Sequence, residues 1–226
     1  MATNYYDKLP KHLKSDNSVD KHYKNHMIKP RSMITCIGGT GVGKTNALID
    51  FLNRKNESFY QVILFNPVSV DEPLYNLMKE KMPEIQVFTD INELPELESF
   101  PDSENKEEKL MILDDFINLK PKEMKKLNKY LTGGRKKGFT VWSMVQNYTS
   151  CPKIITRNTH YFLIYKLNDT HTISNVLKNH NINNIDKDKF RKMYVEATKE
   201  PLSFFLVDLK DESTHLRKCW TDIFKV

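Results

Sequence analysis

The stretch Gly38-Gly39-Thr40-Gly41-Val42-Gly43-Lys44-Thr45 fits the pattern G-x-x-x-x-G-K-[S/T]. An apolar run at 33–37 precedes it and is typical of a buried strand, and residues 45–55 follow it with the apolar spacing of a helix. A glycine-rich turn between a strand and a helix is the context in which this pattern binds phosphate. We therefore predict a phosphate-binding loop (P-loop) at 38–45; an ordinary glycine turn with an incidental lysine is the alternative.

Each part of this loop has a chemical task. The glycines let successive backbone N–H groups turn toward a phosphate, and the following helix presents the positive end of its dipole. We expect Lys44 to reach the β- and γ-phosphates of ATP and Thr45 to ligate Mg²⁺. The residues predicted to contact the nucleotide are Gly38, Gly39, Thr40, Gly41, Val42, Gly43, Lys44, Thr45 and Asn46.

A second acidic motif fits the same chemistry. Four apolar residues at 110–113 are followed by Asp114 and Asp115. A buried strand of this kind would bring both carboxylates to its carboxyl end, which is where ligands bind in open α/β sheets. We expect Asp114 to hold Mg²⁺, directly or through water, and Asp115 to orient or deprotonate the attacking water. A strand that simply ends in an acidic turn is the alternative.

The rest of the chain predicts an α/β domain with a mostly parallel sheet flanked by helices. The expected strands lie at 33–37, 61–66, 86–88, 110–113, 140–145, 161–165 and 203–209. The expected helices lie at 45–55, 73–82, 122–131 and 186–199. Residues 1–29 are polar without a sustained period, so we interpret them as an N-terminal arm and 30–226 as the domain. Asp186 is expected to cap the last helix.

Composition and charge indicate the kind of partner and the cellular compartment of this protein. The chain has 226 residues and only seven glycines, all of them at 38–43 or 133–138. Its net charge is +6, although the acidic stretch 88–108 carries −7, so the remaining body is strongly basic and favours a polyanionic partner. We expect neither a secretory signal nor a transmembrane helix, because the first residues are polar and the longest apolar runs are strand-sized. Three distant cysteines favour a reduced, intracellular setting.

The GTPase guanine-reading motif N-K-x-D is absent, because the nearest string, at 128–131, lacks the aspartate. A nucleotide or nucleoside kinase is an alternative function, since the basic glycine loop 133–138 could serve as a lid over phosphates. That loop, however, precedes a strand ending at Gln146. A polar residue at a strand tip beside two aspartates is typical of the water-orienting sensor of an oligomeric ATPase.

The order GGTGVGKT, MILDD, GGRKKGFTVWSMVQ and then P-x-x-I-x-R-N at 152–158 resembles the FtsK/HerA superfamily of DNA-pumping ATPases. Within it, the chain looks like the virion-packaging ATPases of poxviruses, giant viruses and virophages. The resemblance runs from about residue 28 to the end, and includes the terminal segment YVEATKEPLSFFLVDLKDESTHLRKCWTDIF. It implies a RecA-like P-loop NTPase of the ASCE type.

The resemblance also implies a function and further site residues. It implies a ring-forming homo-oligomer, a hexamer or pentamer, which uses ATP and Mg²⁺ to package double-stranded viral DNA. Capsid vertex or portal components are implied as partners, and the virion or host-cell cytoplasm as the location. Arg135 matches an arginine inserted into the neighbouring subunit's site, Gln146 matches the sensor, and Arg157 matches a further family arginine. A non-viral plasmid or conjugative DNA-transfer ATPase is a third interpretation.

Overall fold

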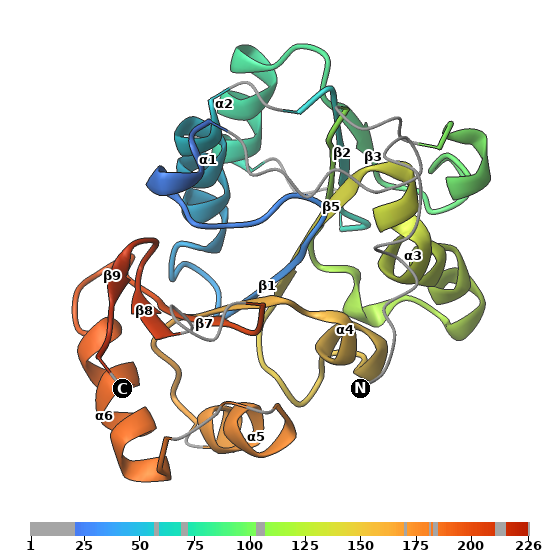
Figure 1. Ribbon diagram of the computed structural model, residues 1–226. Coiled ribbons are helices and arrows are strands. Elements are labelled where there is room, and N and C mark those ends of the chain that lie inside the picture. Colours follow the sequence, from blue (N-terminus) through green and yellow to red (C-terminus); the bar gives the residue numbers. More distant parts are fainter. Residues whose placement is uncertain are drawn as a thin grey trace, which may run out of the picture.

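Nine strands form one sheet in the computed structural model of this chain, in the order β3-β2-β4-β5-β1-β6-β7-β8-β9 (Figure 1). The structure describes residues 21–56, 59–68, 72–102, 107–169, 171–180, 182, 185–210 and 216–225. The strands are β1 (Met33–Ile37), β2 (Gln61–Phe65), β3 (Gln86–Phe88), β4 (Lys109–Leu113), β5 (Phe139–Val145), β6 (Tyr161–Ile164), β7 (Phe205–Asp208), β8 (Leu216–Lys218) and β9 (Asp222–Ile223). The first six are parallel, and β7, β8 and β9 continue the sheet in antiparallel pairing.

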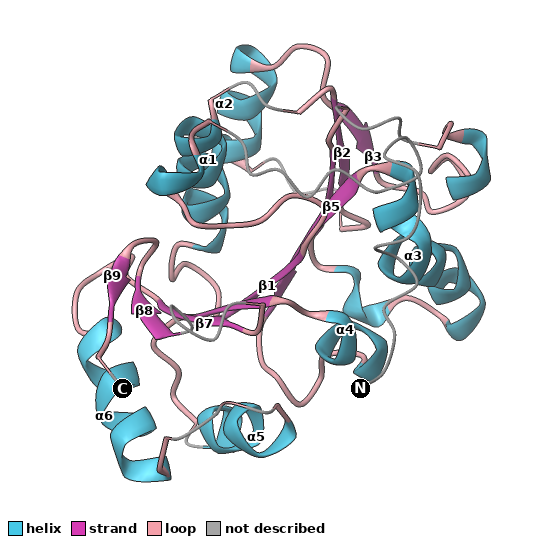
Figure 2. Cartoon of the chain, in the orientation of Figure 1, coloured by secondary structure: helices cyan, strands magenta, loops and turns pink. Residues whose placement is uncertain are grey.

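Helices cover both faces of this sheet (Figure 2). The α-helices are α1 (Lys44–Lys55), α2 (Pro73–Lys81), α3 (Pro121–Gly133), α4 (Lys153–Asn158), α5 (His171–Asn179) and α6 (Lys187–Ala197). The 3₁₀ turns are η3 (Tyr23–Asn25), η4 (Leu97–Ser99), η5 (Phe116–Asn118) and η6 (Gly134–Lys137). The predicted α/β class with a mostly parallel sheet is thus confirmed, and so is Asp186 as the N-cap of α6, where its carboxylate accepts two backbone N–H groups.

Alternate residues of the buried strands supply two separate cores, as the period of a strand requires. Ile34 and Cys36 of β1 face the layer of α1 and α2. Met33 and Ile37 face the layer of α3, α4, α5 and α6. Because helices cover both faces, the central strands are buried along their whole length and mostly apolar, which is why they are recognisable as short apolar runs.

The two ends of the described chain pack on α1. His26 and Ile28, which precede residue 30, are buried, and the His26 ring meets Phe51 edge-on at 5.3 Å. From the other end, Trp220 stacks on Phe51 at 5.7 Å and donates its indole N–H to Asp50. Residues 26–28 therefore belong to the packed body, whereas residues 1–20 of the proposed arm lie outside the described residues.

The acidic stretch lies against the basic side of α3. Lys126 and Lys129 form ion pairs with Glu96, and Lys129 also pairs with Glu98. The hydroxyl of Tyr130 donates to the carbonyl of Pro95 at 2.7 Å. The acidic stretch contains the 3₁₀ turn η4, and part of the basic character of α3 is neutralised within the chain.

Parallel strands give the sheet two chemically distinct edges. We call the edge at which β1, β4 and β5 end the P-loop edge, and the edge at which they begin the opposite edge. The register pairs Ile37 with Val145 and Leu113 with Ser143, so the residues that follow these three strands emerge close together.

Candidate nucleotide site

The P-loop leaves β1 and enters α1 as predicted. Gly41 and Gly43 have φ of 77° and 107°, a backbone conformation that favours glycine. Gly38 is needed for a different reason, since a Cβ there would lie 2.7 Å from Val42 and 2.9 Å from the Cβ of Tyr165. Tyr165 also braces the loop, because its hydroxyl donates to the carbonyl of Gly43 at 2.9 Å.

Lys44 crosses the inside of this loop. Its ammonium donates to the carbonyl oxygens of Gly38 and Gly39 at 2.7 and 2.8 Å. Burial lowers the pKa of Lys44, while the nearby carboxylates of Asp114 and Asp115 counteract that effect. The lysine is thus held between the loop and the aspartates, where a phosphate would meet it. The outer residues of the loop are open to solvent: Thr40, Gly41 and Asn46.

Asp114 emerges from β4 at the P-loop edge in a hydrogen-bonded setting. The Tyr75 hydroxyl of α2 donates to its Oδ2 at 2.6 Å, and the Asn66 amide lies 3.5 Å from the same oxygen. Burial raises the pKa of Asp114, and the hydrogen bond from Tyr75 opposes that rise. The carboxylate is therefore positioned by other side chains rather than free in solvent.

Asp115 follows with φ of 48°, the left-handed region that is uncommon outside glycine. Aspartate tolerates this conformation better than most residues, yet backbone of this kind concentrates at functional sites. Asp115 is the N-cap residue of η5, so the chain turns within two residues of the end of β4.

The oxygen donors at this edge fit a magnesium ion. Mg²⁺ in nucleotide sites is usually held by one or two carboxylates together with phosphate oxygens and water. The Thr45 hydroxyl, at the start of α1, and the Asp114 carboxylate, which follows β4, are hard oxygen donors at the same edge of the sheet. Among the described residues no group of three or more His, Cys, Asp or Glu side chains could hold a metal by itself. The phosphates would therefore have to complete the coordination.

Gln146 follows β5, which lies between β1 and β4. The side chain is exposed at the P-loop edge. Because Ile37 pairs with Val145, Gln146 lies beside Gly38, the first residue of the P-loop. The strand order therefore brings Lys44, Asp114, Asp115 and Gln146 to one edge, as the sequence predicted.

The two arginines lie elsewhere. Arg135 is in η6, which precedes β5, and Arg157 is near the end of α4, which precedes β6. Both side chains are exposed near the opposite edge. The positive charge of Arg135 contributes there to lowering the pKa of His160 and of Lys210.

This position bears on the kinase alternative. Loop 133–138 begins at the end of α3 and leads into the first residue of β5, so it sits at the opposite edge. A lid must reach the phosphates that it covers. The predicted lid over the P-loop of the same chain is thus wrong for this structure, because a whole strand length separates the two loops.

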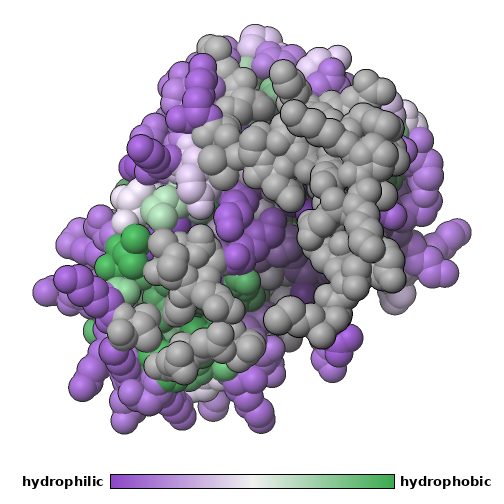
Figure 3. All heavy atoms as spheres, viewed as in Figure 1, coloured by the Kyte–Doolittle hydropathy of each residue, from purple (hydrophilic) through white to green (hydrophobic). Residues whose placement is uncertain are grey.

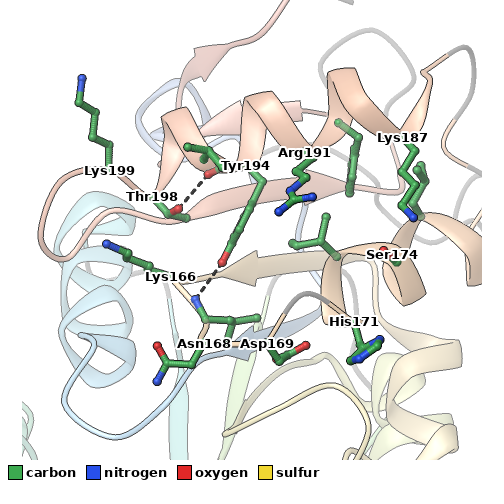
Figure 4. Close-up of a pocket in the computed structure, with 15 residues that line it drawn as sticks. Lys166, Asn168, Asp169, His171, Ser174, Lys187, Arg191, Tyr194, Thr198 and Lys199 are labelled. Atoms are coloured by element: carbon green, nitrogen blue, oxygen red, sulfur yellow. Dashed lines mark hydrogen bonds between the residues drawn. The ribbon is translucent and has the colours of Figure 1, made fainter.

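A separate pocket of about 550 Å³ lies between α5 and α6 (Figure 4). Ile173, Phe190 and Tyr194 give it an apolar wall, and the apolar patch at the lower left of Figure 3 lies over these helices. The Tyr194 hydroxyl accepts the backbone N–H of Leu167 at 2.8 Å and donates to the carbonyl of Tyr165 at 3.2 Å. Tyr165 thus connects this pocket to the P-loop.

Sequence reasoning did not identify Tyr75, Asn66 or Tyr165 as site residues. Tyr165 was assigned to a strand and Asn66 to the end of another, and both follow strands that end at the P-loop edge. Their position directly after these strands, at the edge where the P-loop lies, is a sequence feature that indicates a place in the site. Tyr75 gives no such signal, because it reaches Asp114 only through the packing of α2.

Comparisons with known proteins agree with this geometry. A family profile described as Poxvirus A32 protein matches residues 19–203. No curated protein matches the chain. Within the described residues, no helix combines the length and apolar character needed to cross a membrane.

Several solved structures share the fold at low sequence identity. The genome packaging NTPase B204 from Sulfolobus turreted icosahedral virus 2, in complex with sulfate, has a TM-score of 0.59 and 14% identity, covering 88% of this chain and 100% of that one. The DNA-packaging ATPase B204 from Sulfolobus Turreted Icosahedral Virus has a TM-score of 0.57 and 13% identity, and the match covers 83% of this chain and 96% of that one. The pCW3 conjugation coupling protein TcpA, with ATPgS, has a TM-score of 0.58 and 14% identity, and the match covers 96% of this chain and 72% of that one.

Proposed function

This chain belongs to the Poxvirus A32 protein family, and we propose that it is an ATPase that packages double-stranded viral DNA into a capsid. The observation that carries the proposal is the convergence of Lys44, Asp114, Asp115 and Gln146 at one sheet edge beside a P-loop. The solved structures that share this fold include viral genome-packaging enzymes, some of them in complex with ATP analogues.

Each side chain has a role in the proposed hydrolysis. Lys44 neutralises charge on the β- and γ-phosphates, while Thr45 and Asp114 hold Mg²⁺, which withdraws charge from the phosphates when bound. Asp115 orients the attacking water or accepts its proton, and Gln146 positions that water from the neighbouring strand tip. The loop residues from Gly38 to Asn46 hold the nucleotide.

The chemistry is tested by Lys44→Ala and Asp115→Asn. Lys44→Ala removes charge stabilisation without removing core volume, so we expect turnover to be abolished in a folded protein. Asp115→Asn should bind MgATP and hydrolyse it slowly. Lys153→Ala, at an exposed position of α4, serves as the matched lysine control and should keep full activity. Near-normal ATPase activity of either site variant would contradict the assignment.

The DNA partner is proposed from the basic body and the family. A motor that follows the phosphate backbone should bind duplexes of unrelated sequence equally, and its affinity should fall linearly on a log–log plot against salt through counterion release. DNA-stimulated ATPase activity separates a packaging or conjugative motor from a kinase. A neighbouring capsid gene separates the packaging motor from a plasmid or conjugative one.

We propose a homo-oligomeric ring, a hexamer or pentamer, in which Arg135 serves the site of the next subunit. The proposal is supported by the position of Arg135 near the opposite edge, where it is exposed and remote from its own P-loop. Arg157 is the second candidate, since it lies near the same edge. The location in the virion or host-cell cytoplasm, and contact with capsid vertex or portal components, are proposed from the resemblance.

A mixing experiment tests the shared site. Arg135→Ala should bind nucleotide and lose about 10³–10⁵ in rate if the arginine reaches transition-state charge. In mixed oligomers with Lys44→Ala, activity should partly return, because some interfaces combine an intact Lys44 with an intact Arg135. Native mass measurement must show that the subunits exchange. No recovery in mixed oligomers would refute the role of Arg135 and favour Arg157.

A further inference from the structure

Tyr75 reaches from α2 into the proposed metal site. The side chain is only 5% exposed, and its hydroxyl donates to Oδ2 of Asp114 at 2.6 Å. The Asn66 amide approaches the same oxygen at 3.5 Å and is itself fixed, because its Oδ1 accepts the backbone N–H of Val68. Both contacts are on one carboxylate oxygen, so Oδ1 of Asp114 is the oxygen that they leave for a further ligand.

The contact between Tyr75 and Asp114 has only one possible direction. A tyrosine hydroxyl has a single hydrogen and an ionised carboxylate can only accept, so Tyr75 is the donor. The bond fixes the rotation of the Asp114 carboxyl group, because Oδ2 must stay beside the phenol. A carboxylate that ligates a cation needs a fixed orientation of this kind, since its other oxygen must face the metal.

We propose that Tyr75 is a positioning residue for Mg²⁺: its hydroxyl donates to Oδ2 of Asp114 and thereby holds Oδ1 in the orientation that faces the cation. This inference rests on the proposed ATPase function and adds a residue to it. Partners of this kind, which hold metal ligands without touching the metal, typically contribute 10–100-fold to metal affinity. The hydrogen bond from Tyr75 is compatible with a bound metal, because it occupies Oδ2 of Asp114 and leaves Oδ1 for the cation.

Tyr75→Phe removes the hydroxyl and keeps the ring. The readout is binding of a fluorescent ATP analogue by anisotropy, titrated with Mg²⁺ at fixed nucleotide and repeated in EDTA. We expect the half-saturating Mg²⁺ concentration to rise about 10–100-fold. Binding in EDTA should stay unchanged, because the P-loop and Lys44 remain intact. Mn²⁺ bound to the protein–nucleotide complex, measured by electron paramagnetic resonance, should weaken in parallel.

Tyr130→Phe is the matched control. Tyr130 is buried, and its hydroxyl makes one strong hydrogen bond, to the carbonyl of Pro95 at 2.7 Å, on the face of the sheet opposite to α2. This variant should lose a similar hydrogen bond and keep the wild-type Mg²⁺ dependence.

The outcomes are separable. An unchanged Mg²⁺ dependence in Tyr75→Phe overturns the inference while leaving the ATPase proposal standing. Tighter Mg²⁺ binding also overturns it, because the hydroxyl would then compete with the metal. A variant too unstable to purify assigns the hydroxyl to folding and likewise counts against the inference. If wild-type protein binds no nucleotide with or without Mg²⁺, the proposed function itself fails.

Discussion

His160 gives the stability of this protein a defined pH dependence. Its Nδ1 accepts the backbone N–H of Met33 at 2.8 Å, which requires an unprotonated nitrogen. Burial, together with the charges of Lys210 and Arg135, lowers the pKa of His160 to about 4. The folded protein therefore keeps this ring neutral at a pH where the unfolded chain protonates it.

The sign of the effect follows from proton binding. Below the ordinary histidine pKa of about 6.5, the unfolded state binds a proton that the folded state does not, so the free energy of unfolding falls as the pH falls. With a folded pKa of about 4, the loss between pH 7 and pH 5 is about 2 kcal/mol. For a chain of this size that corresponds to a fall in Tm of about 4–8 °C.

The assay compares wild type with His160→Asn, whose amide oxygen can still accept the N–H of Met33. Thermal unfolding of both proteins is followed by circular dichroism from pH 7 to pH 5. Other titrating groups contribute equally to both, so the difference between the two slopes isolates His160. We expect wild type to lose more stability than the variant over this range. Parallel slopes would refute the reasoning, because they would mean that the histidine titrates normally when folded.

Three further predictions concern stability and the P-loop. Gly43→Ala places a Cβ 2.7 Å from the side chain of Leu202 at a φ of 107°, so nucleotide binding should weaken and the free energy of unfolding should fall by about 1–3 kcal/mol. Adding Leu202→Ala to the same chain removes the close contact and should restore part of this stability. Arg217→Met leaves Asp208 without its fully buried ion-pair partner, so chemical denaturation should show a loss of about 3–5 kcal/mol. Asp186→Ala removes the N-cap of α6 and should cost about 1 kcal/mol without changing ATPase activity.

The sequence predicted the parts of the fold that depend on local signals. The strand before the P-loop, the helix after it and the strand before Asp114 each combine an apolar run with a chemically constrained end, and all three are confirmed. Once these strands are parallel, their ends must meet at one edge. The joint position of Lys44, Asp114 and Gln146 therefore followed from topology and required no knowledge of side-chain packing.

The missed elements lack such signals. Helix α4 has six residues, and strands β8 and β9 have three and two, so each is too short for a period to be detected. These strands exist because β7 offers an edge to pair with, which is a tertiary effect. Helix α5 was missed because its polar residues, among them His171 and Asn175, lie in a stretch without strong helix boundaries. Tyr75 was missed for a similar reason, since its role depends on how α2 docks.

The separation of the two sheet edges constrains how subunits can share a site. The P-loop, Asp114 and Asp115 are at one edge, and Arg135 and Arg157 are near the other. If an arginine of one subunit completes the site of another, the contact joins two different surfaces, because the donor edge is not the acceptor edge. When the two edges lie in different interfaces, such a contact is heterologous, and repeating it gives either a closed ring or an open filament. A two-fold dimer produces the same contact only when both edges lie in one interface, so that each arginine enters the other subunit's site. The mixing experiment therefore tests the composite site, and the native mass of the wild-type assembly tests the ring.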